Sequence, residues 1–155
     1  MKKICLLVFM LQAMVAVNAF AQDEQPYINK SFVVIQSTKE YKKAKAEAIK
    51  ASQQLKQQLN LRALTSNGKT GLTYSEKECE NEGGYPCYIA RGRYDDGDYV
   101  SIEWSNAFTG FTKGYYIVVV YSGNTTEANI VLSKAKKIFK DAYSKQASVY
   151  VGCMH

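Results

Sequence analysis

Cysteine supplies the most reactive side chains of this sequence, and two cysteines, Cys79 and Cys87, stand eight positions apart. Between them lies 81–86, a stretch rich in turn-forming residues that can bring the two thiols together. A metal site would need further ligands, and the sequence holds no second Cys or His pair nearby. We therefore predict a structural disulfide between Cys79 and Cys87.

The end of the sequence, Cys153-Met154-His155, combines the thiol, thioether and imidazole groups that suit Cu(I). Three consecutive residues of an extended chain point to alternating sides, so a single ion would need a bend in the backbone. We expect instead that Cys153 is capped or forms an intermolecular disulfide. The sequence thus predicts no metal site and no cofactor.

No group of residues in the sequence predicts catalysis. The only histidine is His155, so a Ser–His or Cys–His relay would depend on the terminal residue. The acidic stretch Asp95–Asp98 is interpreted as a solvated hairpin turn, because the later Glu of a calcium loop is missing. Gly68-Lys69-Thr70 resembles the end of a phosphate-binding loop, but Ala63 stands where the first Gly of that loop is required. We predict that the protein is not an enzyme, and a hydrolase is the least favoured alternative.

Aromatic residues make up 12% of the chain and gather in its middle. Rings stack on the faces of sugars or anchor protein interfaces, and Arg can bridge acidic groups. Roughly half of these rings must form the core, because a domain of this size buries its large side chains. The residues expected to contact a ligand or partner are Tyr85, Tyr88, Arg91, Arg93, Trp104, Phe108, Phe111 and Tyr115.

Hydrophobic periodicity predicts strands and two helices that would position these side chains. A flexible leader is expected over residues 22–30, followed by a single α+β domain over 31–155 with an insert at 68–114. In this insert, Asp95–Asp98 would join two strands as a hairpin. The predicted strands cover 31–36, 61–65, 87–91, 99–104, 115–121 and 148–151, and the helices follow Thr38 to Gln58 and Asn124 to about Tyr143.

The two ends of the domain repeat one pattern at a distance of 84 residues, which lays Phe32 on Tyr116 and Ala44 on Ala128. Each half then reads as strand, helix, strand, and right-handed crossovers put both helices on one face of a shared sheet. We predict a doubled β-α-β unit (βαββαβ-like) with one antiparallel or mixed sheet, two helices on one face and an inserted disulfide-bearing hairpin region. The opposite face of the sheet would be open for recognition.

The first residues have the pattern of a secretory signal: Met1-Lys2-Lys3 precedes the apolar run Ile4–Val17 and the small residues of Ala19-Phe20-Ala21. The run of about 14 residues is shorter than the roughly 20 needed to span a bilayer. We expect a signal peptide over 1–21, cleaved after Ala21. Removal of these 21 of the 155 residues leaves 134, with 18 basic against 14 acidic groups and a charge of about +4 instead of +6. The sequence therefore predicts a periplasmic or secreted protein with no transmembrane segment.

Lysine is concentrated on the two predicted helices. The simplest interpretation is that these lysines form solvated outer faces, and an anionic partner such as a cell-wall polymer or lipid headgroups is the alternative. No nucleic-acid partner is expected, because the protein is exported and acidic residues are interspersed. The lysines are Lys42, Lys43, Lys45, Lys50 and Lys56 on the first helix and Lys134, Lys136, Lys137 and Lys140 on the second.

The stretches Phe32–Ser37 leading into Ala44, and Tyr116–Ser122 leading into Ala128, resemble the SPOR family, the sporulation-related repeat domains of the bacterial envelope. Asp141-Ala142-Tyr143 before the last strand is similar to the ending of that family. The resemblance implies that the sheet face away from the helices binds the glycan strands of peptidoglycan.

These observations predict an exported, non-enzymatic binding module of the bacterial cell envelope. It would bind peptidoglycan glycan or an envelope protein through the open sheet face and the aromatic insert. The alternative is a small secreted or periplasmic enzyme inhibitor or immunity-type protein. Such a protein would plug the cleft of an enzyme with the loop between Cys79 and Cys87.

Overall fold

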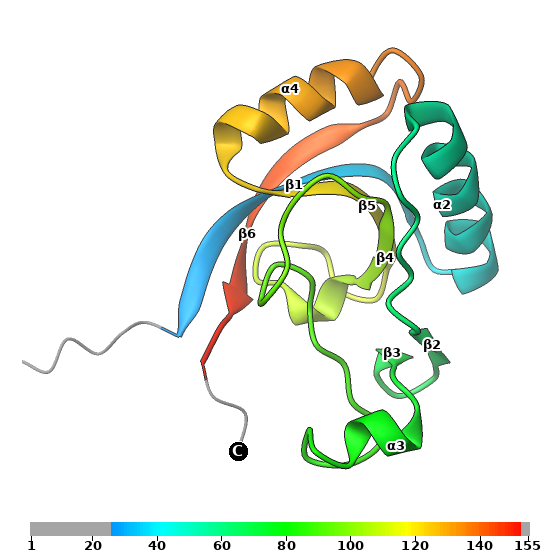
Figure 1. The fold of residues 1–155 in the computed structure, drawn as a ribbon, viewed down its shortest axis with the longest axis vertical. Helices are drawn as coiled ribbons and strands as arrows, with labels where there is room; N and C mark the ends of the chain where they lie inside the picture. The colour runs from blue at the N-terminus through cyan, green and yellow to red at the C-terminus, as the bar shows by residue number, and fades with distance from the viewer. Residues whose placement is uncertain (1–25, 153–155) are drawn as a thin grey trace, which may run out of the picture.

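Four strands form the main sheet of the computed structural model, which describes residues 26–152 (Figure 1). The sheet has the strand order β4-β5-β1-β6, and each neighbouring pair is antiparallel. The predicted α+β class is confirmed. The predicted signal peptide at 1–21, the start of the leader and Cys153-Met154-His155 lie outside the described residues. The strands are β1 (Tyr27–Thr38), β4 (Ser101–Trp104), β5 (Tyr116–Gly123) and β6 (Tyr143–Tyr150).

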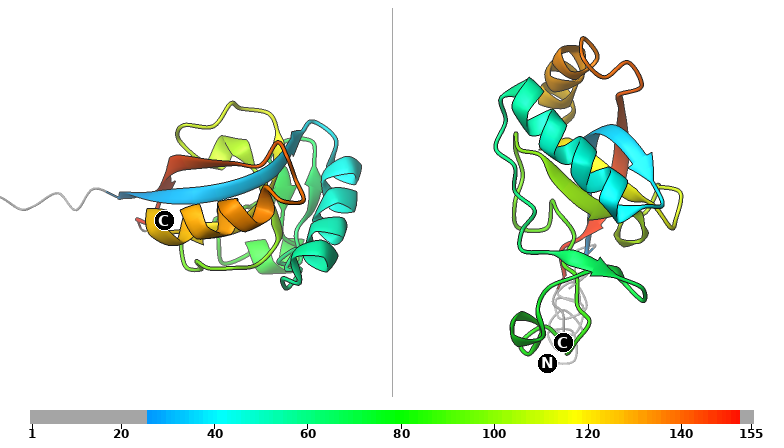
Figure 2. Two further views of the ribbon diagram at one scale, coloured as in Figure 1. Left: turned by 90° about the horizontal axis from the view of Figure 1, so that it is seen from above. Right: turned by 90° about the vertical axis from the view of Figure 1, so that its right-hand side faces the viewer.

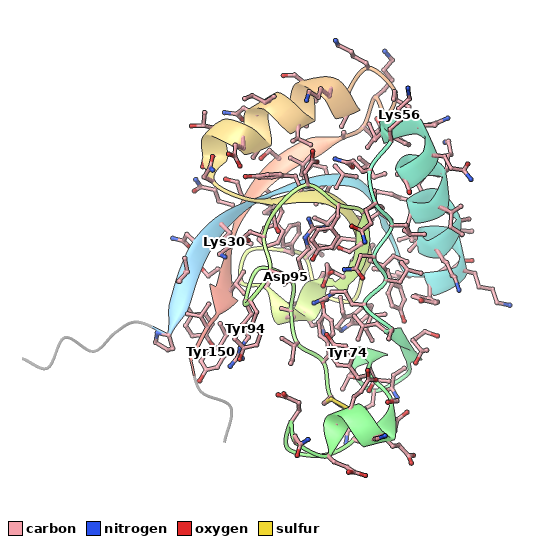
Figure 3. All side chains as sticks on the ribbon, viewed as in Figure 1. Lys30, Lys56, Tyr74, Tyr94, Asp95 and Tyr150 are labelled. Carbon is pink, nitrogen blue, oxygen red and sulfur yellow. A yellow bond between two sulfur atoms is a disulfide. The ribbon has the colours of Figure 1, made fainter. Side chains whose placement is uncertain are left out.

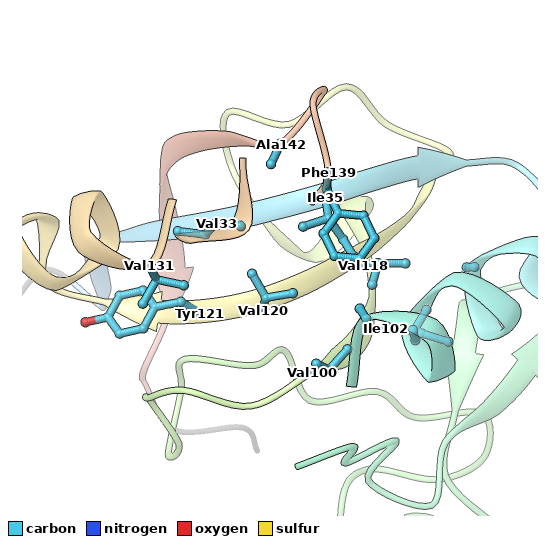
Figure 4. Close-up of a cluster of buried hydrophobic side chains, with 14 of the residues drawn as sticks. Val33, Ile35, Val100, Ile102, Val118, Val120, Tyr121, Val131, Phe139 and Ala142 are labelled. Carbon is cyan, nitrogen blue, oxygen red and sulfur yellow. The ribbon is translucent and has the colours of Figure 1, made fainter. Parts of the chain in front are cut away.

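Two long helices, α2 (Tyr41–Leu55) and α4 (Thr125–Ala135), lie on the same face of this sheet (Figure 2). Each helix buries alanines, such as Ala44 in α2 and Ala128 in α4, which have no exposed surface. Such small side chains let a helix approach the sheet closely. The larger residues that fill the space between the layers include Val33, Ile35, Val118, Val120, Val131 and Phe139 (Figure 4).

The face of the sheet opposite the helices is partly covered by the loop that follows the 3-10 turn η1 (Ser105–Ala107). Phe108 is fully buried and Phe111 is 7% exposed. Both rings meet Phe32 of β1 edge-on, with centroid distances of 5.0 and 6.1 Å. Only part of the face that was expected to be open is therefore exposed, because Phe108 and Phe111 form a second hydrophobic core with the sheet on that face.

A small lobe projects from the sheet (Figure 1), and it carries the predicted disulfide. We call residues 65–87 the disulfide lobe; it consists of β2 (Thr65–Asn67), β3 (Gly71–Thr73) and α3 (Glu76–Cys79). The Cys79–Cys87 bond is present, with the Cα atoms 5.5 Å apart. Gly71, with a φ of +74°, lies against the ring of Trp104, where an added Cβ would approach ring carbon Cδ2 to 2.1 Å. The absence of a side chain at Gly71 thus allows the lobe to dock on β4.

Replacing Cys79 and Cys87 together by Ser is expected to lower the free energy of unfolding by about 2.5 kcal/mol. A cross-link that closes so short a loop removes that much chain entropy from the unfolded state. Urea titrations of the wild type with and without reductant, and of the double Ser variant, measure the effect. Reductant should move the wild type to the stability of the variant and leave the variant unchanged. Equal stability of the oxidised and reduced wild type would contradict the prediction.

The first residue of β1, Tyr27, lies beside the last residue of β6, Tyr150. The two strands pair from there to Val34, which lies opposite Tyr143. The rings of Tyr27 and Tyr150 meet edge-on at 5.2 Å. β1 therefore begins at Tyr27, inside the predicted flexible leader, because pairing with β6 orders these residues.

Several predicted elements have different bounds in the structure, and the predicted hairpin is wrong. Residues 87–91 form no strand, so only the second half of the hairpin exists, as β4. The predicted strand at 61–65 is a turn, in which Arg62 and Ala63 have φ values of 53° and 55°. The second helix ends at Ala135 instead of Tyr143, and Tyr143 opens β6, which was predicted to begin only at residue 148.

The 84-residue repeat holds for the helices but not for the strands. Ala44 and Ala128 are both buried under the sheet, as the repeat predicts. Phe32 and Tyr116, however, lie on opposite faces: Phe32 belongs to the core under the loop and Tyr116 to the core under the helices. The register between β1 and β5 shifts on both sides of Val34, and such irregularities change which face a residue occupies.

Candidate binding surface

The eight residues predicted to contact a ligand do not form one site. Tyr85 lies on the disulfide lobe and is 51% exposed, whereas Phe108 and Phe111 belong to the core. Trp104 is half-buried between Gly71 and Tyr116, with its ring centroid 4.8 Å from that of Tyr116. The other four residues lie in four different surroundings.

Tyr88 belongs to a buried polar cluster centred on Glu103 of β4, which has no exposed surface. One carboxylate oxygen, Oε2, accepts hydrogen bonds from the Tyr88 hydroxyl and from Arg62 Nη2, both at 2.5 Å. Burial raises the pKa of Tyr88 well above its ordinary value, and the charge of Glu103 raises it further. Burial alone would lower the pKa of Arg62, but the negative charge of Glu103 and smaller contributions from Tyr88, Tyr74 and Asp95 together outweigh this effect, and the pKa is raised. The cluster therefore holds two segments against β4: the turn at Arg62 and Ala63, and the segment after the disulfide lobe.

Arg91 is fully buried, and its guanidinium is held by acceptors on every side. It stacks on the ring of Tyr99, 3.6 Å from the centroid. Burial lowers its pKa. These contacts join the segment after the disulfide lobe to β4 and β5, so Arg91 stabilises the fold and is enclosed away from any ligand. Its side chain donates to Gly97 O at 2.7 Å, to Tyr99 O, Ser101 Oγ and Ser122 Oγ at 2.9 Å, and to Val119 O at 3.3 Å.

Arg93 stands between the rings of Tyr94 and Tyr150, with its guanidinium carbon 5.0 and 5.3 Å from the two centroids. Figure 3 labels the two tyrosines. It also donates a hydrogen bond to the carbonyl of Gly152. Tyr94 is 75% exposed, so one face of this stack reaches solvent. The arrangement ties the segment after Arg91 to the end of β6.

Tyr115 lines a pocket of about 190 Å³ on the sheet face away from the helices. The pocket lies where the end of β1 and the starts of β5 and β6 meet the loop after η1. The hydroxyls of Ser37 and Tyr143 lie 3.2 Å apart in a hydrogen bond across it. We call this site the Tyr115 pocket; its lining residues are Ser37, Phe111, Thr112, Tyr115, Ile117, Tyr143 and Lys145.

Two lysines give the Tyr115 pocket a positive character. Lys39 Nζ lies 5.6 Å from the centroid of the Tyr115 ring, and Lys145 Nζ lies 5.5 Å from that of Phe111. The described lining contains hydroxyls, rings and a cation, with no carboxylate. Such a surface can stack a ring of a ligand, hydrogen-bond its hydroxyls and attract its negative charge.

A second hollow, of about 500 Å³, lies between the start of β1, the turn at 96–97 and the start of α4. Its lining includes Asp96 and Glu127. The ammonium of Lys30 pairs with Asp96 at 2.5 Å, and Tyr121 donates to Glu127 at 2.7 Å. These polar groups therefore already have partners within the protein.

The chain matches no protein-family model, no curated protein and no solved structure. Within residues 26–152, no helix has the length and apolar character needed to cross a bilayer. In the same range, no three His, Cys, Asp or Glu side chains gather closely enough to hold a metal ion. The disulfide is typical of proteins that fold in an oxidising compartment.

Sequence reasoning identified Phe111 and Tyr115 but missed the residues that β1 and β6 bring to the pocket. Tyr143 and Lys145 alternate on β6 and so lie on the same face of the sheet. The sequence does not reveal this alternation, because the helical spacing of apolar residues after Asn124 predicts a helix that continues to about Tyr143. Lys39 follows the end of β1 and carries no local sign of a binding role.

Proposed function

We propose that this chain is an exported, non-enzymatic binding module of the cell envelope and that it binds glycan chains at the Tyr115 pocket. The observation that carries the proposal is the presence of half-exposed Tyr115 and Tyr143 beside Lys39 and Lys145 on the sheet face away from the helices. Tyrosine rings stack on the apolar faces of sugars, and the hydroxyls bond to those of the sugar.

The order of elements supports this proposal. With the disulfide lobe set apart, β1, α2 and β4 read as one β-α-β unit, and β5, α4 and β6 read as a second. We propose that the two units form the doubled arrangement expected from the resemblance to the SPOR family. In that family the sheet face away from the helices binds glycan strands of peptidoglycan, whose carboxylates the two lysines would attract.

Retention on purified cell-wall sacculi tests the glycan proposal. Tyr115→Ala and Tyr143→Ala should each weaken binding about 5- to 30-fold, since a central aromatic contact contributes roughly 1–2 kcal/mol. Tyr94→Ala is the matched control, because Tyr94 is a more exposed tyrosine outside the pocket. Wild-type retention that survives both pocket substitutions, or a protein that is not retained at all, would overturn the proposal.

An enzyme inhibitor or immunity-type protein is the second candidate, favoured by one observation. Tyr85 is 51% exposed in a loop that the Cys79–Cys87 bond closes, next to Gly83 and Gly84 with φ values of 87° and 97°. A fixed, protruding ring of this kind fits the cleft of an enzyme. Tyr85→Ala separates the two candidates: it should leave sacculus binding intact if the Tyr115 pocket is the site, and would break a tight 1:1 protein complex if the loop is.

A further inference from the structure

A cluster of lysines lies at one end of the helical layer. Four of them stand within the seven residues 134–140 at the end of α4, and all four are exposed. Lys50 of α2 reaches the same segment, with Nζ 5.4 Å from the ring centroid of Phe139. Lys56 caps the C-terminal end of α2 and, in the view of Figure 3, points toward the same end of the helical layer. We call this group the lysine patch: Lys50, Lys56, Lys134, Lys136, Lys137 and Lys140.

The fold holds the segment after α4 rigidly against the core. Hydrogen bonds continue past Ala135, from Lys136 N to Leu132 O at 2.9 Å and from Phe139 N to Ala135 O at 2.8 Å. Phe139 and Ala142 are 7% and 2% exposed and anchor the segment. Because Phe139 points inward, its neighbours on both sides point to solvent.

Ile138 lies between these lysines and is 42% exposed. A lysine-rich surface that serves only for solubility gains nothing from a large apolar side chain at this place. The combination of cations around an exposed apolar residue is the pattern of surfaces that lie on a membrane: the cations meet anionic headgroups and the apolar side chain enters the interface.

Few acidic groups neutralise the lysine patch. Lys50 pairs with Glu47 at 3.1 Å, and Asp141 follows Lys140 in the sequence. The other five lysines make no ion pair within residues 26–152. The net positive charge of the patch therefore faces solvent, where it can act on an anionic surface over about one Debye length, roughly 8 Å at physiological salt.

We propose that the lysine patch docks the protein on the surface of an anionic lipid bilayer, with Ile138 entering the interface between headgroups and acyl chains. The patch belongs to the helical layer, whereas the Tyr115 pocket opens on the other face of the sheet. The proposal does not depend on what the pocket binds.

Sedimentation with lipid vesicles tests the proposal on the exported, processed protein. Vesicles with 30–40% phosphatidylglycerol, on the order of a natural anionic content, should bind the wild type, and pure phosphatidylcholine vesicles should not. The variant K136Q/K137Q/K140Q should bind about 100-fold more weakly, at roughly five-fold per lysine. Ile138→Ser should weaken binding several-fold at unchanged charge. The charge-matched control K42Q/K69Q/K77Q removes three exposed lysines outside the patch and should bind like the wild type.

Three outcomes would overturn the proposal. One is absence of binding to anionic vesicles; another is equal loss of binding in the patch variant and in the control. The third concerns a soluble anionic polymer, polyphosphate: if it binds the protein as tightly as the vesicles do and Ile138→Ser has no effect on either, the patch recognises a polymer. All variants share the same N-terminal residues, so any contribution of those residues is constant, and circular dichroism checks that each variant is folded.

Discussion

Replacing Arg91 with Met is expected to lower the free energy of unfolding by about 3–5 kcal/mol, because removal of a buried, fully hydrogen-bonded charged group leaves its partners unsatisfied. The carbonyls of Gly97, Tyr99 and Val119 all accept hydrogen bonds from this one guanidinium, and Met can donate none. A loss of this size is a large part of the stability of a typical domain, about 5–15 kcal/mol. Urea unfolding followed by circular dichroism measures it.

Two further variants separate geometry from charge. Arg91→Lys keeps the positive charge but loses the planar fork that reaches several acceptors, so it should also lose several kcal/mol. Lys77→Met removes a cation from the surface of the disulfide lobe and should change stability by less than about 0.5 kcal/mol. A stability of Arg91→Met within about 1 kcal/mol of the wild type would show that the buried network contributes little.

Raising the pH from 9 to 11 is expected to lower the free energy of unfolding by about 2–3 kcal/mol. In the folded state the pKa of Tyr88 lies well above the ordinary value, first through burial and then through the charge of Glu103. Between the ordinary pKa of about 10 and the folded value, the unfolded chain binds fewer protons, so stability falls by up to about 1.4 kcal/mol per pH unit. The contribution of Tyr88 is therefore complete below pH 10 and is lost as the pH rises through the folded pKa.

Burial also raises the pKa of other tyrosines, and Tyr99 and Tyr121 among them add smaller amounts in the same direction. Burial raises the pKa of Tyr99, and the hydrogen bond to Asp95 raises it further although Arg91 lowers it. Burial and the hydrogen bond to Glu127 raise the pKa of Tyr121 to about 12. The contributions of both are smaller because their partner carboxylates lie nearer to solvent, which screens charge.

The slope of stability against pH between 9 and 11 is the quantity to measure, by urea titration at each pH. Tyr88→Phe should make the slope shallower, whatever it does to stability at neutral pH. Tyr94→Phe is the control and should leave the slope unchanged, since Tyr94 is 75% exposed in the folded protein. A wild-type stability that stays level or rises over this range would contradict the prediction.

The helical layer was predictable because its signals are local. Ala44, Ala48 and Ala51 recur at helical spacing, and the structure buries all three. The disulfide was predictable because Cys79 and Cys87 flank a short turn-rich stretch. The end of α4 could not be predicted, because Lys136 and Lys137 are good helix formers and no Gly or Pro follows to stop the helix.

The role of Arg91 could not be predicted from its neighbours. Arginine is rarely buried without partners, so sequence reasoning placed it on a surface. Two of its acceptors lie on β5, 28 and 31 residues away, and most of its acceptors are backbone carbonyls that any residue type supplies. The Tyr115 pocket was half predictable for a related reason: Phe111 and Tyr115 lie in an aromatic loop, whereas Tyr143 reaches the pocket only through the pairing of β6 with β1.

The pairing of Tyr27 with Tyr150 also determines how the protein responds to mechanical load. The first residue of β1 and the last of β6 are neighbours in an antiparallel pair, so a pull on both ends of the described chain acts across the hydrogen bonds at one corner of the sheet. Under such tension the two strands separate one residue pair at a time, beginning with the edge-on pair of Tyr27 and Tyr150. The central strand β1 would therefore separate from the edge strand β6 before any force is transmitted to the disulfide lobe.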